Sequence, residues 1–426
     1  MRQLAKLLSL QTIIKECSMS SPRCLSFLLF ILTISASSSG QASPQQTSED
    51  TLNSGTLLTN GTVIGGYGDA VYQNDGNAKT STVDLERVVL FVGHSFRNIS
   101  FFSELEMEDA KVSGDENGGE IAFEQAYLKF NLDQNHYITA GLFLPRIGIL
   151  NENHLPTDFY GNERTQTETF IIPSTWRELG VGFYGSLNSL LINYSIGIFN
   201  GLNSASFEHG SGIREGRFEG KNASANNLAV TGALQLYEGN LTVQASGYFG
   251  GSAGVSPRQA DSLQLTSGLF GTPVALGEAD AQYEANGFTA KILGTIVSIP
   301  NASDINRAYA NNTPLSEFGA YAEAGYNILQ SSQGPEGKAL TVFGRYETLD
   351  MNATIPANGI ADGTLRQQHI VLGLNYLPIK NVIIKGDVRF VHTGTENPAL
   401  IAVRDLAGQP YSSNDTIFTL GIGYSF

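Results

Sequence analysis

The chain has 426 residues, and its 25 Lys and Arg residues against 40 Asp and Glu residues give a formal net charge of −15 at pH 7. An acidic chain is a poor candidate for nucleic-acid binding. Its only two cysteines, Cys17 and Cys24, lie near the N-terminus, so neither a disulfide scaffold nor a thiolate metal site is expected in the rest of the chain.

The first 42 residues have the pattern of a secretory signal peptide. The apolar run LSFLLFILTI at 25–34 follows Arg23, and small residues continue to Ala42. The run is too short for a membrane-spanning helix, which needs about 20 apolar residues. Cleavage would remove four basic residues and Glu16, leaving a net charge of −18. Residues 43–60, rich in Ser, Thr, Gln and Asn, are expected to form a flexible periplasmic lead-in.

From Gly61 onward, apolar residues alternate with polar ones in blocks of about ten, as in strands that are apolar on one face. After Ala42 no apolar run is long enough for a helix that crosses a bilayer, so a helical membrane protein is excluded. The alternation predicts 16 strands, at residues 61–72, 82–96, 99–109, 119–132, 137–146, 177–185, 189–200, 227–237, 241–251, 278–285, 288–299, 315–329, 338–349, 366–377, 382–392 and 414–426.

The connectors between these strands alternate in length. Almost every second one is short, for example Arg97-Asn98 and the pair at 286–287, whereas the intervening ones are mostly long, such as 147–176 and 201–226. Periplasmic turns and external loops of outer-membrane barrels differ in this way. We therefore predict a 16-stranded antiparallel transmembrane β-barrel over residues 61–426, with both ends on the periplasmic side. A soluble β-sandwich or a β-solenoid is the alternative.

The last predicted strand has a continuous apolar face that reaches the final residue. A lipid bilayer would solvate this face. We expect the last residue to close the barrel against the first strand, and the face to act as a signal for the barrel-assembly machinery. The face consists of Phe418, Leu420, Ile422, Tyr424 and Phe426.

Charged residues in the strands are expected to face the barrel lumen. A Lys or Arg on the lipid face costs about 2–4 kcal/mol at the bilayer midplane. In one predicted strand Glu124 and Lys129 fall on opposite faces, which indicates a bulge or a strand end outside the membrane. The candidate lumen residues are Arg87, Glu104, Glu106, Glu108, Lys129, Arg345, Glu347, Lys385, Asp387 and Arg389.

Residues 84–185 contain the segments EQAYLKF, AGLFLPRIG and PSTWRELGVGFYG. This stretch resembles the phosphate-selective porin O/P family of Gram-negative bacteria. The resemblance implies a 16-stranded outer-membrane barrel, usually a homotrimer, with a long third loop folded into the lumen. It does not establish phosphate as the solute.

The connector at 147–176 is the candidate for that third loop and for the pore constriction. Opposite charges held close together across a pore create a transverse field and select solutes by charge. The same charges could equally serve to hold the loop to the barrel wall. The candidates are Arg146, Glu152, His154, Asp158, Glu163, Arg164, Glu168, Arg177 and Glu178.

The sequence thus predicts a porin for passive diffusion of small hydrophilic or anionic solutes, with outer-membrane lipid and lipopolysaccharide around it. A non-conducting barrel that acts as an adhesin or scaffold through its loops is the alternative. We expect no catalysis, cofactor or metal. Ser252 lies in GGSAG, a G-x-S-x-G match that chance explains in a chain with 47 glycines. Asp109, Asp115, Glu116 and Glu120 could hold a divalent cation near lipopolysaccharide, although a solvated acidic loop is the simpler interpretation.

Overall fold

The computed structural model describes residues 61–111, 119–330, 337–400 and 411–426. The predicted signal peptide, the lead-in, and Asp115 and Glu116 lie outside the described residues. The described part contains the 16 strands that the alternation predicts. They are β1 (Thr62–Asp75), β2 (Thr80–Phe96), β3 (Ile99–Glu108), β4 (Ile121–Asn131), β5 (His136–Phe143), β6 (Glu178–Leu187), β7 (Ile192–Asn200), β8 (Leu228–Glu238), β9 (Leu241–Gly251), β10 (Pro273–Ala285), β11 (Phe288–Ser298), β12 (Ser316–Asn327), β13 (Ala339–Thr354), β14 (Arg366–Ile379), β15 (Val382–Thr393) and β16 (Asn414–Ser425).

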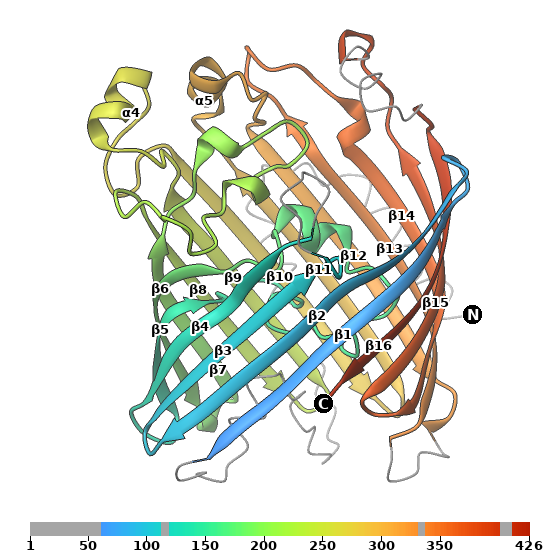
Figure 1. Cartoon of the computed structure of the whole chain (residues 1–426). Coiled ribbons are helices and arrows are strands. Elements are labelled where there is room, and N and C mark those ends of the chain that lie inside the picture. Colours follow the sequence, from blue (N-terminus) through green and yellow to red (C-terminus); the bar gives the residue numbers. More distant parts are fainter. Residues whose placement is uncertain (1–60, 112–118, 331–336, 401–410) are drawn as a thin grey trace, which may run out of the picture. The chain divides into compact units, whose positions relative to one another are not determined.

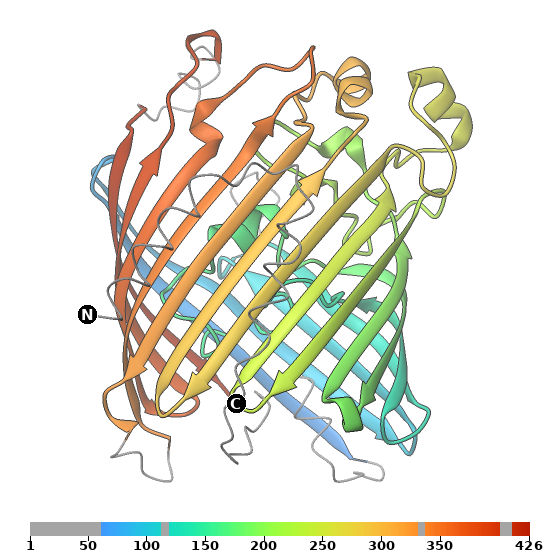
Figure 2. The ribbon, with the colours of Figure 1, turned by 180° about the vertical axis from the view of Figure 1, so that it is seen from behind.

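The strands form one closed antiparallel barrel (Figures 1 and 2). Each strand pairs with its neighbours in sequence, and β1 pairs with β16 from Tyr67 opposite Ser425 to Asp75 opposite Ile417. Phe426 extends this closure, because its backbone exchanges hydrogen bonds of 3.1 and 2.9 Å with Gly66. Closure leaves none of the 16 described strands with an unpaired edge, as a barrel in lipid requires. The predicted barrel of 16 antiparallel strands is confirmed, including its closure by the last strand.

Side-chain exposure alternates along the strands, as the sequence pattern requires. In β12, for example, Phe318 and Tyr326 are exposed, whereas Glu317, Tyr321 and Glu323 are buried. The outer surface of the barrel is therefore apolar, and its inner face carries the polar and charged groups. The five apolar residues of the last strand, Phe418, Leu420, Ile422, Tyr424 and Phe426, are all exposed.

One end of the barrel carries tight turns, and the other carries longer connections. Short helices lie in the connections: η1 (Thr167–Ile171), η2 (Asn188–Leu190), η3 (Ser204–Ser206), η4 (Arg214–Gly216), α4 (Pro257–Leu263), α5 (Ala302–Tyr309), η6 (Gly363–Leu365) and η7 (Pro398–Leu400). None of the helices in the described residues is long and apolar enough to cross a membrane.

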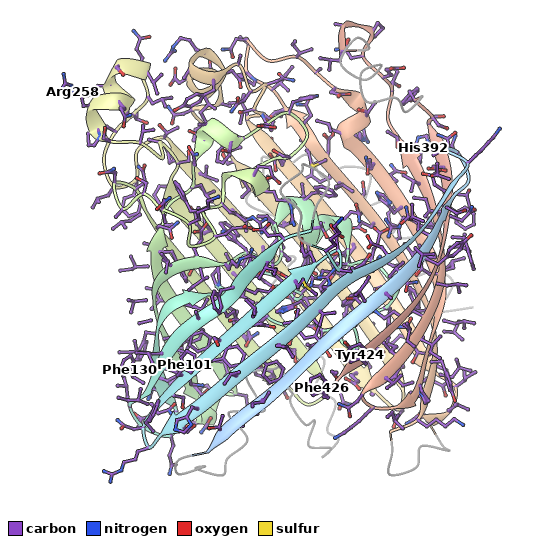
Figure 3. All side chains as sticks on the ribbon, viewed as in Figure 1. Phe101, Phe130, Arg258, His392, Tyr424 and Phe426 are labelled. Carbon is purple, nitrogen blue, oxygen red and sulfur yellow. The ribbon has the colours of Figure 1, made fainter. Side chains whose placement is uncertain are left out.

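Aromatic side chains gather at the end of the barrel that has the tight turns. Figure 3 labels Phe101, Phe130, Tyr424 and Phe426 at this end, and Arg258 and His392 at the other. Exposed Tyr283 and Phe288 flank one of the tight turns. Aromatic girdles lie at both interfaces of outer-membrane barrels, so these side chains fit one of the two interfaces.

Several strand boundaries differ from the predicted ones, among them those of β5, β10 and β13. β5 ends at Phe143, because Pro145 has no N–H group to donate to the ladder. β10 begins at Pro273 instead of 278, since this segment continues its pairing with β9. β13 continues to Thr354, beyond the predicted end at 349.

A β-bulge in β4 explains how Glu124 and Lys129 can both point to the inside of the barrel. The pairing of β3 with β4 shifts register between Glu104, which lies opposite Gln125, and Leu105, which lies opposite Phe123. Glu124 is the extra residue, and it and Lys129 are therefore both buried on the inner face. Of the two explanations that the sequence left open, a bulge or a strand end outside the membrane, the structure shows the bulge.

Candidate pore constriction

The connection between β5 and β6, residues 144–177, is the longest segment between two strands in the described part of the chain, and its two ends are apolar. Ile147, Ile149, Ile171, Ile172 and Trp176 are almost fully buried. They belong to one hydrophobic cluster with residues from the connections that follow β7, β9 and β11. This apolar cluster fixes both ends of the segment. The polar middle of the segment lies between these ends, next to the inner face of the barrel.

The polar middle of this segment is bound to the inner faces of β13, β15 and β16. The backbone N–H and the side-chain amide of Asn162 both donate to Asp387 Oδ2, at 2.9 and 2.8 Å. Lys385 Nζ donates to the carbonyl oxygens of Phe159 and Gly161, at 3.1 and 2.7 Å. Arg389 forms a 2.6 Å ion pair with Glu163.

Two further charges of β13 contact the same segment. Arg345 donates to the carbonyl oxygens of Tyr160 and Glu163, both at 3.4 Å, and Glu347 accepts from the backbone N–H of Thr167. Five of the predicted lumen residues, Arg345, Glu347, Lys385, Asp387 and Arg389, therefore hold the segment to the wall.

The close approach of the segment to β16 depends on glycine. Asn162 Nδ2 also donates to Thr419 Oγ1 at 3.0 Å. The neighbouring Gly421 faces the same side, and a Cβ atom there would overlap the side-chain oxygen of Asn162. The segment thus packs on the inner face of the last strand, where the side chains are small.

Glu168 holds the turn at the start of the segment. Its Oε2 atom accepts from the backbone N–H groups of Ile149 and Leu150, at 2.8 and 2.6 Å, and its Oε1 atom accepts from the Tyr321 hydroxyl at 2.7 Å. Burial raises the pKa of Glu168 to about 7, although these hydrogen bonds act in the opposite direction. The carboxyl group is therefore a structural tie that titrates near neutral pH.

On the opposite wall, His154 lies between two carboxylates of β3 and β4. Its Nε2 atom is 3.5 Å from Glu124 Oε2 and 3.9 Å from Glu104 Oε1, and all three side chains are almost fully buried. Burial lowers the pKa of His154, but the negative charge of Glu124 and the proximity of Glu104 outweigh it and raise the pKa to about 10.

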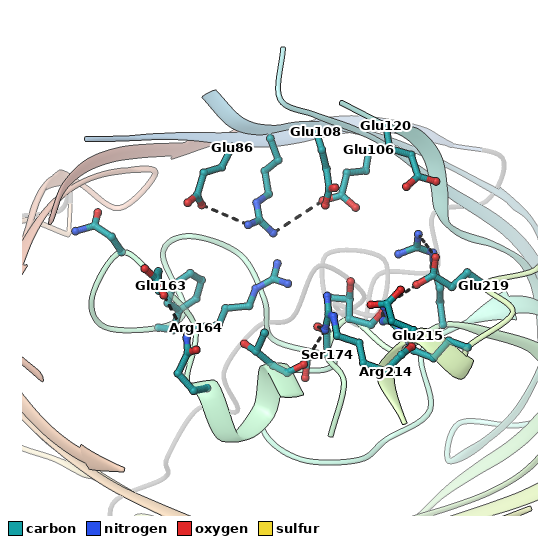
Figure 4. Close-up of a pocket in the computed structure, with 18 residues that line it drawn as sticks. Glu86, Glu106, Glu108, Glu120, Glu163, Arg164, Ser174, Arg214, Glu215 and Glu219 are labelled. Carbon is teal, nitrogen blue, oxygen red and sulfur yellow. Dashed lines mark hydrogen bonds and ion pairs between the residues drawn. The ribbon is translucent and has the colours of Figure 1, made fainter. Parts of the chain in front are cut away.

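A charged cavity of about 420 Å³ lies between the first strands and the loops. Figure 4 shows Glu86, Glu106, Glu108 and Glu120 along the strand side and Arg164 and Arg214 on the loop side. The full set of charged lining residues is Glu86, Arg87, Glu106, Glu108, Glu120, Glu163, Arg164, Arg177, Arg214, Glu215, Arg217 and Glu219. The cavity thus has an acidic strand wall opposite a loop wall that contains four arginines.

The arginines around the cavity differ in how they are paired. Arg87 contacts Asp69, Glu86 and Glu106 at 3.1, 3.4 and 3.9 Å. Glu219 forms ion pairs with Arg177 and Arg217, at 3.2 and 2.8 Å.

Arg164 and Arg214 make no ion pair within the described residues. They donate only to carbonyl oxygens, of His154 for Arg164 and of Thr169 and Ser174 for Arg214. Burial and then Arg217 lower the pKa of Arg214 to about 10, and burial and then Arg87 lower that of Arg164. Arg214 stays cationic at neutral pH, so its charge remains available to an anion in the cavity.

The remaining candidates lie at the roots of the segment, within it or on the strands. Arg146 forms a 2.6 Å ion pair with Glu152, while the Glu178 carboxylate accepts from Asn200 Nδ2 at 2.6 Å. Burial raises the pKa of Asp158, while Lys291 opposes the shift. Lys129 Nζ lies 3.8 Å from the centre of the Tyr137 ring.

The connection between β7 and β8 also contributes to the cavity, which we did not predict from the sequence. Arg214, Glu215, Arg217 and Glu219 line the cavity, together with Glu86 and Glu120. The run REGRFE at 214–219, with charges of both signs in a loop, was the available signal.

The serine of the G-x-S-x-G match is part of the packed structure of the barrel and not of a catalytic turn. Ser252 is fully buried, and its hydroxyl donates to the Thr272 carbonyl oxygen at 2.6 Å. The nearest helix, α4, begins only at Pro257, so the strand–turn–helix geometry of a nucleophile elbow is not formed here.

Comparison with known proteins supplies a family. The model of the family "Phosphate-selective porin O and P" matches residues 57–398. An uncharacterised protein of Aquifex aeolicus (strain VF5) is 31% identical over 341 residues, which cover 77% of this chain and 75% of that protein.

Solved structures share the fold. The outer-membrane channel DcaP of Acinetobacter baumannii superposes with a TM-score of 0.54 at 14% identity and covers 87% of this chain and 99% of its own. The trimer form of OmpT from Vibrio cholerae has a TM-score of 0.50 at 11% identity, with 86% and 100% covered. The chain belongs to the phosphate-selective porin O and P family and is an outer-membrane porin for small solutes.

Proposed function

We propose that the protein is a passive porin whose narrowest section is the charged cavity between the 144–177 segment and the strand wall of β2–β4. In this proposal the segment is the inward-folded third loop. The observation that carries the proposal is the opposition of Glu86, Glu106 and Glu108 to Arg164 and Arg214 across the cavity. Such an arrangement produces a transverse field that orients dipolar solutes and acts on ions of both signs.

Ion selectivity is expected to be weak. Five arginines and seven glutamates line the cavity, so neither sign dominates the narrow section. The net charge of −15 has little influence, because charges on outer loops are screened beyond about 8 Å at physiological salt. Lysines and arginines of β13 and β15 that could have formed an anion path are occupied by the 144–177 segment.

Planar-bilayer recording on the purified, folded protein tests the proposal. We expect stable conductance, a reversal potential in a KCl gradient close to that of a non-selective pore, and no block of the chloride current by micromolar phosphate. Absence of conductance from correctly folded barrels would favour the alternative, an adhesin or scaffold. A micromolar phosphate block would instead indicate a true anion-binding ladder.

We further propose that the chain is exported with residues 1–42 as a cleaved signal peptide and assembles as a homotrimer. The trimer form of the Vibrio cholerae structure and the family membership support the assembly. The apolar face of β16 supports recognition by the barrel-assembly machinery, and the apolar outer surface supports contact with outer-membrane lipid and lipopolysaccharide. N-terminal sequencing of outer-membrane protein and mass measurement of the detergent-extracted complex test the cleavage site and the trimer.

A further inference from the structure

Three side chains that are distant in sequence converge inside the barrel wall. Glu104 comes from β3, Glu124 from the bulge of β4, and His154 from the 144–177 segment. Glu104 and Glu124 are 0% exposed and His154 is 2% exposed. One potential ligand atom from each lies within 4.8 Å of the other two.

Each of the three groups has a buried atom without a hydrogen-bond partner. Glu104 Oε1, Glu124 Oε1 and His154 Nε2 are all buried without one. The 3.9 Å distance from Nε2 to Glu104 Oε1 exceeds that of a hydrogen bond, and the 3.5 Å distance to Glu124 Oε2 lies at its limit. Buried polar atoms left unsatisfied are destabilising, so a common partner for all three would remove a substantial penalty.

Other hydrogen bonds hold these groups in place, one of them to Glu124 Oε2, the oxygen that lies 3.5 Å from His154 Nε2. His154 Nδ1 lies 3.1 Å from the Asn151 carbonyl oxygen, to which it can only donate. That hydrogen bond leaves the lone pair of Nε2 directed at the carboxylates in the neutral imidazole. Gln125 Nε2 donates to Glu104 Oε2 at 2.9 Å, and the Tyr67 hydroxyl donates to Glu124 Oε2 at 3.3 Å. Outer contacts of this kind orient the ligands in metal sites.

A divalent cation could take the place of the proton on His154 in balancing the two carboxylates. Apart from His154, no basic group in the described residues lies within 4.0 Å of Glu104 or Glu124. The nearby Arg87 is already shared by Asp69, Glu86 and Glu106. Two carboxylates and one neutral imidazole around a divalent cation give a neutral site, which suits deep burial.

We propose that Glu104, Glu124 and His154 bind a divalent transition-metal ion, Zn²⁺ by preference, that ties the 144–177 segment to the wall of β3 and β4. Tetrahedral ligands about 2.0–2.1 Å from zinc lie roughly 3.3 Å from one another, somewhat closer than the 3.5 and 3.9 Å from His154 Nε2 to the two carboxylates. Imidazole combined with carboxylate suits zinc better than Mg²⁺ or Ca²⁺, which take oxygen ligands.

Metal at this site would set the geometry of the cavity wall. The His154 carbonyl oxygen accepts from Arg164 Nη2 at 3.5 Å, and Glu106 lies two residues from Glu104 on the same strand face. Fixing His154 therefore positions one of the two arginines that make no ion pair. The site is structural, and its existence does not depend on whether the pore conducts.

From the sequence we expected no metal. Glu104, Glu124 and His154 are widely separated along the chain, so no short ligand spacing marks the site. Only the bulge at Glu124 and the path of the 144–177 segment bring the three together.

Metal content after refolding tests the proposal directly. The untagged protein is unfolded in urea with a chelator and refolded into detergent with ZnCl2, MnCl2, CoCl2 or MgCl2, and unbound ions are removed. Heat-modifiable gel mobility identifies folded barrels, and elemental analysis gives bound metal. We expect one zinc per folded chain, no retained Mg²⁺, and visible absorption of the Co²⁺ form typical of four- or five-coordinate nitrogen–oxygen sites.

Matched variants locate the ion. His154→Ala and Glu124→Gln should abolish stoichiometric zinc binding, whereas His369→Ala and Glu106→Gln, which alter a buried histidine and a carboxylate elsewhere on the inner face, should retain it. Tyr67→Phe removes only an outer hydrogen bond and should lower zinc affinity by about 10- to 100-fold. This mild variant keeps the test valid even where ligand variants do not fold.

A proton on His154 Nε2 is the competing occupant. In that case folded wild-type protein would retain no zinc, and ZnCl2 would not raise its unfolding midpoint; either result overturns the proposal. Zinc retained equally by wild type and by a folded His154→Ala or Glu124→Gln variant would also overturn it, because the ion would then lie elsewhere.

Discussion

Asn162 and Asp387, 225 residues apart in sequence, are joined by two hydrogen bonds to the same carboxylate oxygen, at 2.9 and 2.8 Å. This contact fastens the middle of the 144–177 segment to the inner face of β15. Lys385 adds two contacts beside it, so a small part of one strand holds a loop from a distant part of the sequence.

Asp387→Ala should release the middle of this segment. A buried hydrogen bond to a charged group contributes about 1.5–3 kcal/mol, so the free energy of unfolding should fall by at least that amount. In planar bilayers we expect a larger and noisier single-channel conductance. Asp261→Ala, on the exposed face of α4, is the control and should change neither quantity. Unaltered conductance together with lowered stability would mean that the segment does not limit the pore.

Gly421→Val tests the same contact from the opposite side. A side chain at this position would overlap the Asn162 amide and force the segment away from β16. The expected result is again a noisier pore, with a folded fraction close to that of wild type, because Gly421 lies on the inner face and its backbone pairing is retained. A conductance trace identical to wild type would show that the segment can repack without loss.

Single charges in the cavity should shift ion selectivity in opposite directions. A unit charge about 10 Å from an ion in water contributes roughly 0.4 kcal/mol, or about a twofold change in permeability ratio. Arg164→Gln and Arg214→Gln should make the pore more cation-selective, and Glu106→Gln more anion-selective. Reversal potentials in a KCl gradient measure the shifts. Changes of the same sign in all three variants would contradict the cavity as the selective section.

The Glu168 carboxyl group should make stability depend on pH. Its folded pKa of about 7 lies above the ordinary value of 4.5 because of burial, and the Glu278 carboxylate on β10 adds to the shift. A raised pKa means that the contribution is fully present below pH 4.5 and is lost as pH rises through about 7. The effect is on the order of 3 kcal/mol at most.

Urea unfolding between pH 5 and pH 8 checks this expectation. Glu168→Gln keeps an acceptor for Ile149 and Leu150 but cannot ionise, so its unfolding midpoint should vary less with pH than that of wild type. Glu284→Gln, at an exposed position, should follow wild type. Equal pH slopes for wild type and Glu168→Gln would exclude Glu168 as the titrating group.

Phe426→Ser should impair assembly more than it alters the pore. The residue is 64% exposed on the apolar outer face, and its backbone completes the pairing of β16 with β1. Loss of a phenyl group from lipid costs about 2 kcal/mol, at the position where the barrel closes. We expect a smaller heat-modifiable fraction in outer membranes and normal conductance in the barrels that do fold. Thr416→Ser, a conservative change elsewhere in the strand, is the control.

The barrel could be predicted from local sequence alone. Side chains alternate with a period of two in every strand, and the face that contacts lipid must be apolar. The apolar residues of each strand, such as those from Phe418 to Phe426, therefore show which face points outward. The lengths of the connections then indicated strand number and sidedness. An irregularity was indicated too, because a regular strand would place Glu124 and Lys129 on opposite faces, but only the structure showed it to be a bulge and not a strand end.

Which charges meet depends instead on the path of the chain in three dimensions. Local alternation indicates that Lys385 and Asp387 face inward. It does not indicate that both side chains form hydrogen bonds with the backbone of residues 159–162. Glu219, which pairs with Arg177, and Arg214, which faces the cavity, come from a separate loop whose path depends on packing in the apolar cluster. The meeting of Glu104, Glu124 and His154 likewise requires a loop and two strands to be in place together. Such contacts depend on chain paths that no local pattern encodes.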